Sequence, residues 1–268
     1  MSWIRGDVRD FRFPEGEFTH AIHAATDVAR EAAAVETFDS IVGGTARVLD
    51  FCGHRRIPHL LLVSSGAVYG PQPASVERIE EDHAGAPATT LTSTAYGQGK
   101  RAAEWLACAR AERDGYAVRI ARCFAFVGPH IPLDGRFAVG DFIADRAAGR
   151  EILVRGDGTA VRSYLYVADL ARWLWTLLLR GTPGSAYNVG SEDAIDVAAL
   201  ARRIAALDNG GHGIRIAQSP RPGAAAQRYV PGTRKAFDEL GLEPTVALDD
   251  ALARTLAWAR AGAQGGMK

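Results

Sequence analysis

Cysteine is scarce in this chain, and the few cysteines stand far apart. The 268 residues contain only Cys52, Cys108 and Cys123, and no two of them have CxxC spacing. This pattern excludes a disulfide framework and the common cysteine-rich zinc sites, and it is typical of a reducing compartment. His20 and His23 do not indicate a metal site either, because their spacing on a predicted strand sends the two rings to opposite faces.

Long apolar runs and an excess of one charge are also missing. The longest runs, LLLV at 60–63 and WLWTLLL at 173–179, are too short to span a bilayer. The N-terminal MSWIRGDVRD carries charges where a signal peptide needs an apolar segment. The 31 basic residues balance the 31 acidic ones, which excludes bulk attraction to nucleic acid or to an anionic membrane. With 47% apolar residues, the chain is predicted to be globular, soluble and cytoplasmic.

What the chain does contain is an alternation of strand-like and helix-like segments. Strands are predicted at 19–25, 59–65 and 116–124, and helices at 35–52 and 93–114 lie between them. This alternation predicts an α/β fold with a mostly parallel sheet and helices on both faces. After residue 129 the predicted pieces are shorter and more mixed, namely helices at 137–148, 167–179, 197–207 and 248–261 and strands at 151–154, 186–191 and 213–217. A ligand is expected at the carboxyl ends of the parallel strands.

The stretch AYGQGK places Tyr96 and Lys100 one helical turn apart, so both side chains project from the same face. A free phenol has a pKa near ~10, and a neighbouring ammonium favours the phenolate, so the pair predicts a general base that works closer to neutral pH. Ser65, in VSSGAVYG at the end of the preceding strand, is best placed to hydrogen-bond the same substrate oxygen. On spacing alone, a surface helix with an exposed tyrosine and lysine remains an open alternative.

The chain resembles the extended short-chain dehydrogenase/reductase family, the nucleotide-sugar epimerases and dehydratases, in six ordered stretches. These are VSSGAVYG, AYGQGK, RCFAFVGP, GDGTAVRSYLYVADL, AYNVGS and LGLEP. The resemblance implies a Rossmann-like, doubly wound parallel sheet with a smaller mixed α/β substrate lobe. It divides the chain into a dinucleotide-binding domain at 1–128, to which about 155–190 partly returns, and a mainly substrate-binding lobe at 129–268.

The resemblance also implies a catalytic set of Ser65, Tyr96 and Lys100, with NAD or NADP as cofactor and a nucleotide-sugar as substrate. Tyr96 would exchange a proton with a sugar hydroxyl while hydride moves between the sugar carbon and the nicotinamide. Lys100 would also hold the nicotinamide ribose. In the family, an arginine after the GDG turn and another in an RPG stretch contact the diphosphate, and these match Arg162 and Arg221.

The resemblance is incomplete at the start of the chain. The family begins with a strand, a GxxGxxG loop and a helix, whereas this chain opens at WIRGDVRD, which resembles the region around the third strand. Roughly 50 residues, one βαβ unit and its approach, have no counterpart. The strand at 19–25 is therefore expected to have an unpaired edge, either because the chain is a truncated form, which is favoured, or because a partner covers the edge. Such a chain should bind NAD weakly or not at all.

The remaining cofactor contacts implied by the resemblance are few. Asp7 and Val8 would lie near the adenine, and Ala24, Ala25 and Thr26 would follow the fourth strand of the family, beside Tyr96 and Lys100. These positions rest on the resemblance alone.

Departures from the family pattern narrow the reaction. Gly66 and Ala67 stand where the 4,6-dehydratases have an Asp-Glu pair, and Ala67 also stands where the related decarboxylases have a Glu. Ala125 stands where an Asn often contacts the substrate. A 4-epimerase or 4-ketoreductase is therefore predicted, with a 4,6-dehydratase or a non-catalytic nucleotide- or partner-binding relative as alternatives. A hydrolase is disfavoured because no serine stands in a GxSxG elbow. The resemblance further implies a homodimer that pairs through the helices at 35–52 and 93–114.

Overall fold

The computed structural model describes residues 3–26, 33–208 and 213–265, and a four-stranded parallel sheet lies at its centre. The strand order is β1-β2-β3-β8, formed by His20–His23, His59–Ser65, Ala117–Cys123 and Ala186–Val189. All three strand pairs are parallel, and the register places Ser65 at the end of β2 beside Cys123 at the end of β3. The predicted α/β class and parallel sheet are thus confirmed.

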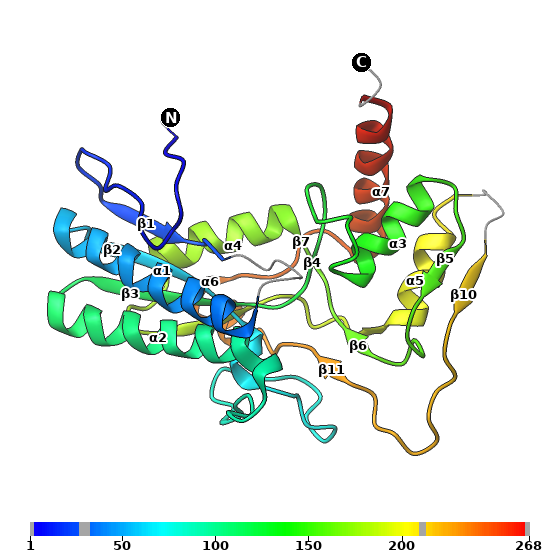
Figure 1. Ribbon diagram of the computed structural model, residues 1–268. Helices are drawn as coiled ribbons and strands as arrows, with labels where there is room; N and C mark the ends of the chain where they lie inside the picture. The colour runs from blue at the N-terminus through cyan, green and yellow to red at the C-terminus, as the bar shows by residue number, and fades with distance from the viewer. Residues whose placement is uncertain (1–2, 27–32, 209–212, 266–268) are drawn as a thin grey trace.

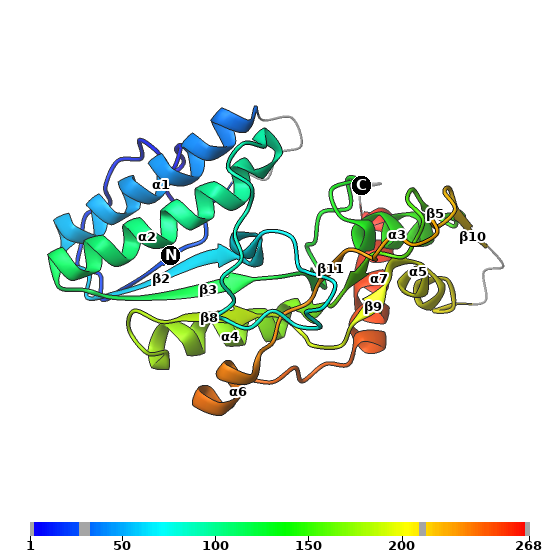
Figure 2. The ribbon, with the colours of Figure 1, turned by 90° about the horizontal axis from the view of Figure 1, so that it is seen from below.

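Helices cover both faces of this sheet. Figure 2 shows α1 (Ala34–Arg55) and α2 (Ala95–Asp114) on one face and α4 (Val167–Arg180) and α6 (Arg234–Leu240) on the other. Under α1 and α2, apolar side chains of the helices pack on alternate residues of β2 and β3, whereas α4 packs Trp173, Leu177 and Leu178 on the opposite side. The sheet is therefore doubly wound, because each strand buries residues on both faces.

The N-terminal segment at 3–19 forms turns and contains no strand, although the sequence there resembles the region around a strand. Instead it lies against α1, where the rings of Phe11, Phe13 and Phe18 surround Phe51 at centroid distances of 5.9, 5.4 and 5.5 Å. Within the described residues, β1 pairs only with β2 and so forms one edge of the sheet, as expected.

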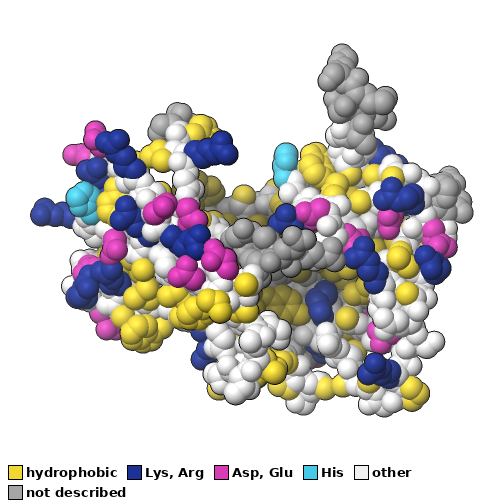
Figure 3. All heavy atoms as spheres, in the orientation of Figure 1, with side chains coloured by type: hydrophobic (Ala, Val, Ile, Leu, Met, Phe, Trp, Pro, Cys, Tyr) yellow, Lys and Arg dark blue, Asp and Glu magenta, His cyan; other side chains and the backbone are white. Residues whose placement is uncertain are grey.

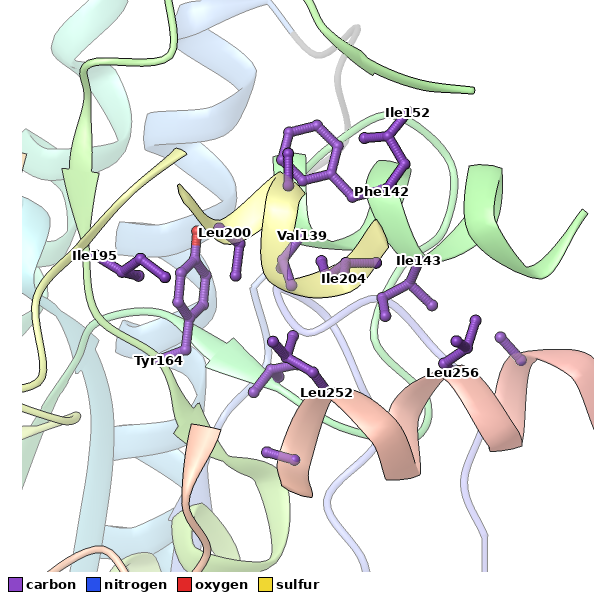
Figure 4. Close-up of a cluster of buried hydrophobic side chains, with 14 of the residues drawn as sticks. Val139, Phe142, Ile143, Ile152, Tyr164, Ile195, Leu200, Ile204, Leu252 and Leu256 are labelled. Atoms are coloured by element: carbon purple, nitrogen blue, oxygen red, sulfur yellow. The ribbon is translucent and has the colours of Figure 1, made fainter. Parts of the chain in front are cut away.

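A second lobe lies beyond the carboxyl end of the sheet, on the right of Figure 1. It contains α3 (Ala138–Ala147), α5 (Val197–Ala205) and α7 (Leu248–Gly265), with β5 (Ile152–Val154) paired to β10 (Ile214–Ile216). Its core is built from aliphatic side chains of the three helices and from Phe142 and Tyr164 (Figure 4). The lobe thus has a hydrophobic core of its own.

Short strands join the two lobes. They are β4 (Phe126–Val127), paired with β7 (Leu165–Tyr166), and the sheet β11-β6-β9, formed by Arg228–Tyr229, Val161–Arg162 and Ile195–Asp196. The chain crosses between the lobes more than once, because α4, β8 and α6 pack on the parallel sheet although they follow residue 129. The expected boundary at residue 128 stays a prediction, and the return of the chain extends past 155–190 to α6. None of the described helices combines the length and apolar character needed to cross a membrane.

Candidate active site

Ser65, Tyr96 and Lys100 meet at the carboxyl edge of the parallel sheet. Ser65 is the last residue of β2, and Tyr96 and Lys100 lie in the first turns of α2, which packs over that strand. Ser65 and Lys100 are only 6% and 5% exposed, and Tyr96 is half-buried. Ser65 lies close enough to Tyr96 to influence the pKa of its phenol, and Lys100 Nζ lies 5.8 Å from the centroid of the Tyr96 ring. The structure therefore brings together the three residues that the sequence singled out.

Glycines allow α2 to approach its neighbours closely at this point. A Cβ atom at Gly97 would lie 2.7 Å from the carbonyl oxygen of Ala67, and one at Gly99 would lie 3.2 Å from Ile41 of α1. The first distance is shorter than a carbon–oxygen contact allows, so a larger residue would push α2 away from the end of β2. The two glycines of AYGQGK thus set the depth at which Tyr96 and Lys100 sit.

The Lys100 ammonium is held by two oxygens, one from the segment after β1 and one from β2. Nζ donates to Thr26 Oγ1 at 2.6 Å and to the carbonyl oxygen of Val63 at 2.9 Å. The Thr26 hydroxyl in turn donates to the carbonyl of Ala25 at 2.8 Å. Thr26, which the resemblance assigned to the cofactor, is therefore in direct contact with the lysine of the catalytic set.

Burial governs the acidity of both groups on α2. It lowers the pKa of Lys100 to about 8. It raises the pKa of Tyr96, and the Ser65 hydroxyl opposes this rise. The expectation that the ammonium makes Tyr96 more acidic is therefore wrong for this structure, because desolvation of the phenolate outweighs the charge of a lysine that is turned towards Thr26 and Val63.

Tyr229 is a member of this site that the sequence did not reveal. It comes from β11, and its hydroxyl lies 3.4 Å from Ser65 Oγ and donates to the carbonyl oxygen of Cys123 at 3.4 Å. Its ring packs on Phe124 with a centroid distance of 4.6 Å. The only sequence signal is Gly66, where a Cβ atom would lie 2.8 Å from the Tyr229 hydroxyl; a glycine alone does not say which residue fills the space.

The two arginines expected at the diphosphate are placed differently. Arg162 on β6 is half-buried, with its guanidinium 6.0 Å from the centroid of the Tyr229 ring, and it donates to the carbonyl oxygens of Val161 and Gln227. It therefore borders the candidate site. Arg221 lies in the exposed segment before β11, where its charge contributes to lowering the pKa of Asp157.

The residues expected near the adenine lie around the edge strand. The Asp7 carboxylate pairs with Arg9 at 2.7 Å, and Arg9 also binds two acidic residues of α1. Val8 packs against α1, and Ala24 and Ala25 are exposed directly after β1. Their contacts with a cofactor stay predictions.

A buried ion pair between α2 and β3 lies next to the candidate site. Glu104 of α2 accepts a hydrogen bond from the Ser64 hydroxyl and pairs with Arg122 of β3 at 2.8 Å. Arg122 also donates to the Tyr69 hydroxyl at 2.8 Å, and Tyr69 donates to Asn188 of β8 at 2.9 Å. This network connects α2, the strand ends and the loop after β2, so it fixes the backbone next to Ser65.

A Rossmann-type sheet with a Tyr and a Lys of one helix at its carboxyl edge defines the class of the short-chain dehydrogenase/reductase folds. A family model described as the NAD dependent epimerase/dehydratase family matches residues 4–190. The chain belongs to this family, which confirms the resemblance seen in its sequence.

Relatives within the family carry different reactions in their names. UDP-glucuronic acid decarboxylase 1 of Xenopus tropicalis is 31% identical over 201 residues, which are 75% of this chain and 47% of that protein. dTDP-glucose 4,6-dehydratase of Streptomyces niveus is 28% identical over 276 residues, covering 95% of this chain and 77% of that protein. This chain therefore spans about half the length of the first of these curated relatives.

Solved structures share the fold. UDP-glucose 4-epimerase of Thermus thermophilus, crystallised as a complex with NAD, superposes with a TM-score of 0.80 at 23% identity, and the match covers 96% of this chain and 84% of that chain. Both lobes of the present structure thus have counterparts in a known architecture.

Proposed function

We propose that this chain forms the catalytic and substrate-binding part of an NAD(P)-dependent nucleotide-sugar oxidoreductase of the 4-epimerase or 4-ketoreductase type. The observation that carries the proposal is the meeting of Ser65, Tyr96 and Lys100 at the carboxyl edge of the sheet, with Tyr229 and Arg162 facing them from the second lobe. The relatives support the substrate class, because their names contain UDP- and dTDP-linked sugars.

The residues fit the reactive end of a nicotinamide cofactor. Lys100 uses two of its donors on Thr26 and Val63 in the described part of the chain, which leaves an N–H for a ribose hydroxyl, and the phenol of Tyr96 lies one turn away. At the diphosphate end the fit is missing, since the sequence contains no GxxGxxG stretch. When bound, the nicotinamide supplies the carbon that takes hydride from the sugar and returns it.

Proton transfer is assigned to Tyr96. Its raised pKa keeps the phenol protonated at neutral pH, which suits donation to the keto oxygen during reduction. The reverse step needs the phenolate, which takes the proton from the sugar hydroxyl. Ser65 would hydrogen-bond the same sugar oxygen and hold it against Tyr96.

The space around Ser65 favours epimerisation or ketone reduction over elimination or decarboxylation. A Cβ atom at Gly66 would lie 2.6 Å from Phe124 and 2.8 Å from the Tyr229 hydroxyl, so an acidic side chain has no room there. Ala67 carries no acid, and its N–H donates to Ser65 Oγ at 3.2 Å. The site therefore lacks the additional acid and base that loss of water or carbon dioxide would use at these positions.

Arg162 is proposed to bind the diphosphate of the nucleotide-sugar, and Arg221 to close over it from the exposed segment before β11. A planar guanidinium suits bidentate contacts with phosphate oxygens. Arg162 is the stronger of the two assignments, because it already borders Tyr229.

A homodimer is proposed through α1 and α2. Figure 3 shows hydrophobic side chains gathered over α2 and the neighbouring part of α1, on the face that the sheet does not cover. Trp105 of α2 and Phe38 of α1 are 72% and 40% exposed. Packing these side chains against a second copy would remove apolar surface from water and stabilise a dimer. The molar mass of the protein in solution tests this proposal.

The activity is tested with a panel of UDP-, dTDP-, GDP- and CDP-sugars, each with NADH or NADPH. One nucleotide class should be turned over, and Tyr96→Phe should reduce kcat by about 10²-fold or more while its Kd for the nucleotide-sugar stays nearly unchanged. Tyr116→Phe is the matched control, because Tyr116 lies at the opposite end of β3 and its hydroxyl donates to the carbonyl of Ala107.

An active Tyr96→Phe variant refutes the assignment of the base. Tight nucleotide-sugar binding without any turnover by the unmodified chain would favour the second candidate, a non-catalytic relative that only binds the nucleotide. That candidate is kept because the sequence contains no GxxGxxG stretch.

A further inference from the structure

Tyr229 reaches the catalytic edge from a distant part of the chain. It is 164 residues from Ser65 in sequence, and β11 places it by pairing with β6 of the second lobe, where Tyr229 lies beside Arg162 in the register. The strand is fixed on its other side as well, since the N–H of Ile79 donates to the carbonyl of Val230 at 3.0 Å. The tyrosine is thus held between the two lobes, and its position depends on how they are joined.

The hydrogen bonds of Tyr229 determine where the Ser65 proton points. Tyr229 donates its only proton to the carbonyl of Cys123, so its hydroxyl oxygen accepts from Ser65. Ser65 Oγ accepts from the N–H of Ala67 with one lone pair. The other lone pair of Ser65 Oγ is therefore left for a donor at the carboxyl edge of the sheet, such as a sugar hydroxyl beside Tyr96.

Neighbouring side chains pack around the Tyr229 ring and fix the position of its hydroxyl. The Tyr229 ring packs on Phe124 with 4.6 Å between the ring centroids. The guanidinium of Arg162 lies 6.0 Å from the centroid of the Tyr229 ring. The hydroxyl occupies the space into which a side chain at residue 66 would project. Burial raises the pKa of Tyr229, so the phenol remains neutral and keeps its proton for Cys123.

We propose that Tyr229 is a positioning residue of the active site, which holds the Ser65 hydroxyl at the carboxyl edge of the sheet, beside Tyr96. Gly66 is the residue that makes room for it. The proposal rests on the proposed function insofar as that function assigns Ser65 to the substrate oxygen. It goes beyond that function by giving the second lobe a direct part in organising the catalytic hydroxyls.

The hydrogen bond is tested first by a measurement that needs no activity. Urea unfolding of the unmodified chain, Ser65→Ala, Tyr229→Phe and the double variant forms a double-mutant cycle. The effects of the two substitutions on the unfolding equilibrium constant should be non-additive by about five-fold, because either one alone removes the shared hydrogen bond. Additive effects overturn the contact.

The positioning role is tested by steady-state kinetics with the nucleotide-sugar that the panel identifies. Tyr229→Phe should lower kcat about ten-fold with little change in KM, since Ser65 is present but no longer held. The double variant should be no slower than Ser65→Ala. Gly66→Ala should reproduce the loss in kcat by displacing the Tyr229 hydroxyl, and Tyr116→Phe should leave kcat unchanged.

The two proposals fail in different ways. If the unmodified chain turns over its sugar and Tyr96→Phe does not, but Tyr229→Phe has the kcat of the unmodified chain, the positioning role is overturned and the proposed function stands. If the unmodified chain turns over no nucleotide-sugar, the proposed function fails and the positioning role fails with it, whereas the unfolding cycle still decides whether the hydrogen bond exists.

Discussion

Acidification is expected to destabilise the protein through His23, the last residue of β1. The ring is 6% exposed, and its Nε2 lies 3.0 Å from the hydroxyl oxygen of Thr45. Thr45 donates its own proton to the carbonyl of Ile41 at 2.7 Å, so it accepts from the imidazole, which is neutral with its proton on Nε2. Burial and then the charge of Lys100 lower the pKa of His23 to about 4.

The direction of the effect follows from the two protonation equilibria. An unfolded histidine has a pKa of about 6.5, so the unfolded chain binds more protons than the folded chain between about pH 6.5 and pH 4. The contribution of His23 to stability is fully present above that window and is lost as the pH falls through it. With these values the loss is about 2 kcal/mol at pH 5 and about 3 kcal/mol at pH 4.

Urea unfolding at pH 7.5 and pH 5 measures this loss directly. His23→Gln cannot be protonated, so the free energy of unfolding of the original chain should fall by about 2 kcal/mol more between the two pH values than that of the variant. His54→Gln is the control, because His54 is exposed near the end of α1 and should leave the pH dependence as it is. Equal pH dependence in the original chain and His23→Gln would show that the buried imidazole does not titrate as described.

Substitutions of Glu104 and Trp105, which are neighbours in α2, should have different effects on the free energy of unfolding. Glu104 is buried against Arg122, so Glu104→Gln should lower the free energy of unfolding by about 3 kcal/mol. Glu112 is exposed, so the control Glu112→Gln should change the free energy of unfolding little. Equal urea midpoints for the two variants would show that the ion pair contributes nothing to stability. Trp105→Glu should leave stability nearly unchanged and give a monomer by light scattering, and a dimer that survives this substitution would move the interface away from α2.

Regular segments of the fold were predictable from periodicity because one face of each is buried. The strand expected at 59–65 is observed over His59–Ser65, and the helix expected at 35–52 is observed over Ala34–Arg55. The two-residue strands β6 and β11 escaped prediction, since alternation cannot be recognised in so few residues. They exist because they pair with each other, and that pairing is a tertiary contact.

Helical spacing predicts the site only where its residues are close in sequence. Ser65 follows from its place at the end of a strand, and Thr26 and Arg162 were added by the resemblance to a family. Helical spacing places Tyr96 and Lys100 on one face, and the structure shows both at the carboxyl edge. The pKa of Lys100 was not predictable, because it depends on burial beside Thr26 and Val63, which come from other segments. Tyr229 was not predictable for the same reason, since it reaches Ser65 only through the joining of the lobes.

The stretches that resemble the family contain residues that join distant segments of the fold. Asn188 of AYNVGS accepts from Tyr69 of VSSGAVYG and donates to the carbonyls of Ile79 and Gly232, so it joins three distant segments. These contacts position strand ends, so they do not by themselves specify a reaction.

In the proposed function, the type of reaction is assigned from the residues around Ser65. Here Gly66 and Ala67 carry no acid, and the hydroxyl of Tyr229 occupies the space where a side chain at residue 66 would project. An added carboxyl group at residue 66 would have to displace Tyr229, and with it the hydrogen bond that orients Ser65. An acidic residue at position 66 therefore requires a second substitution at Tyr229, because the glycine and the tyrosine share one space.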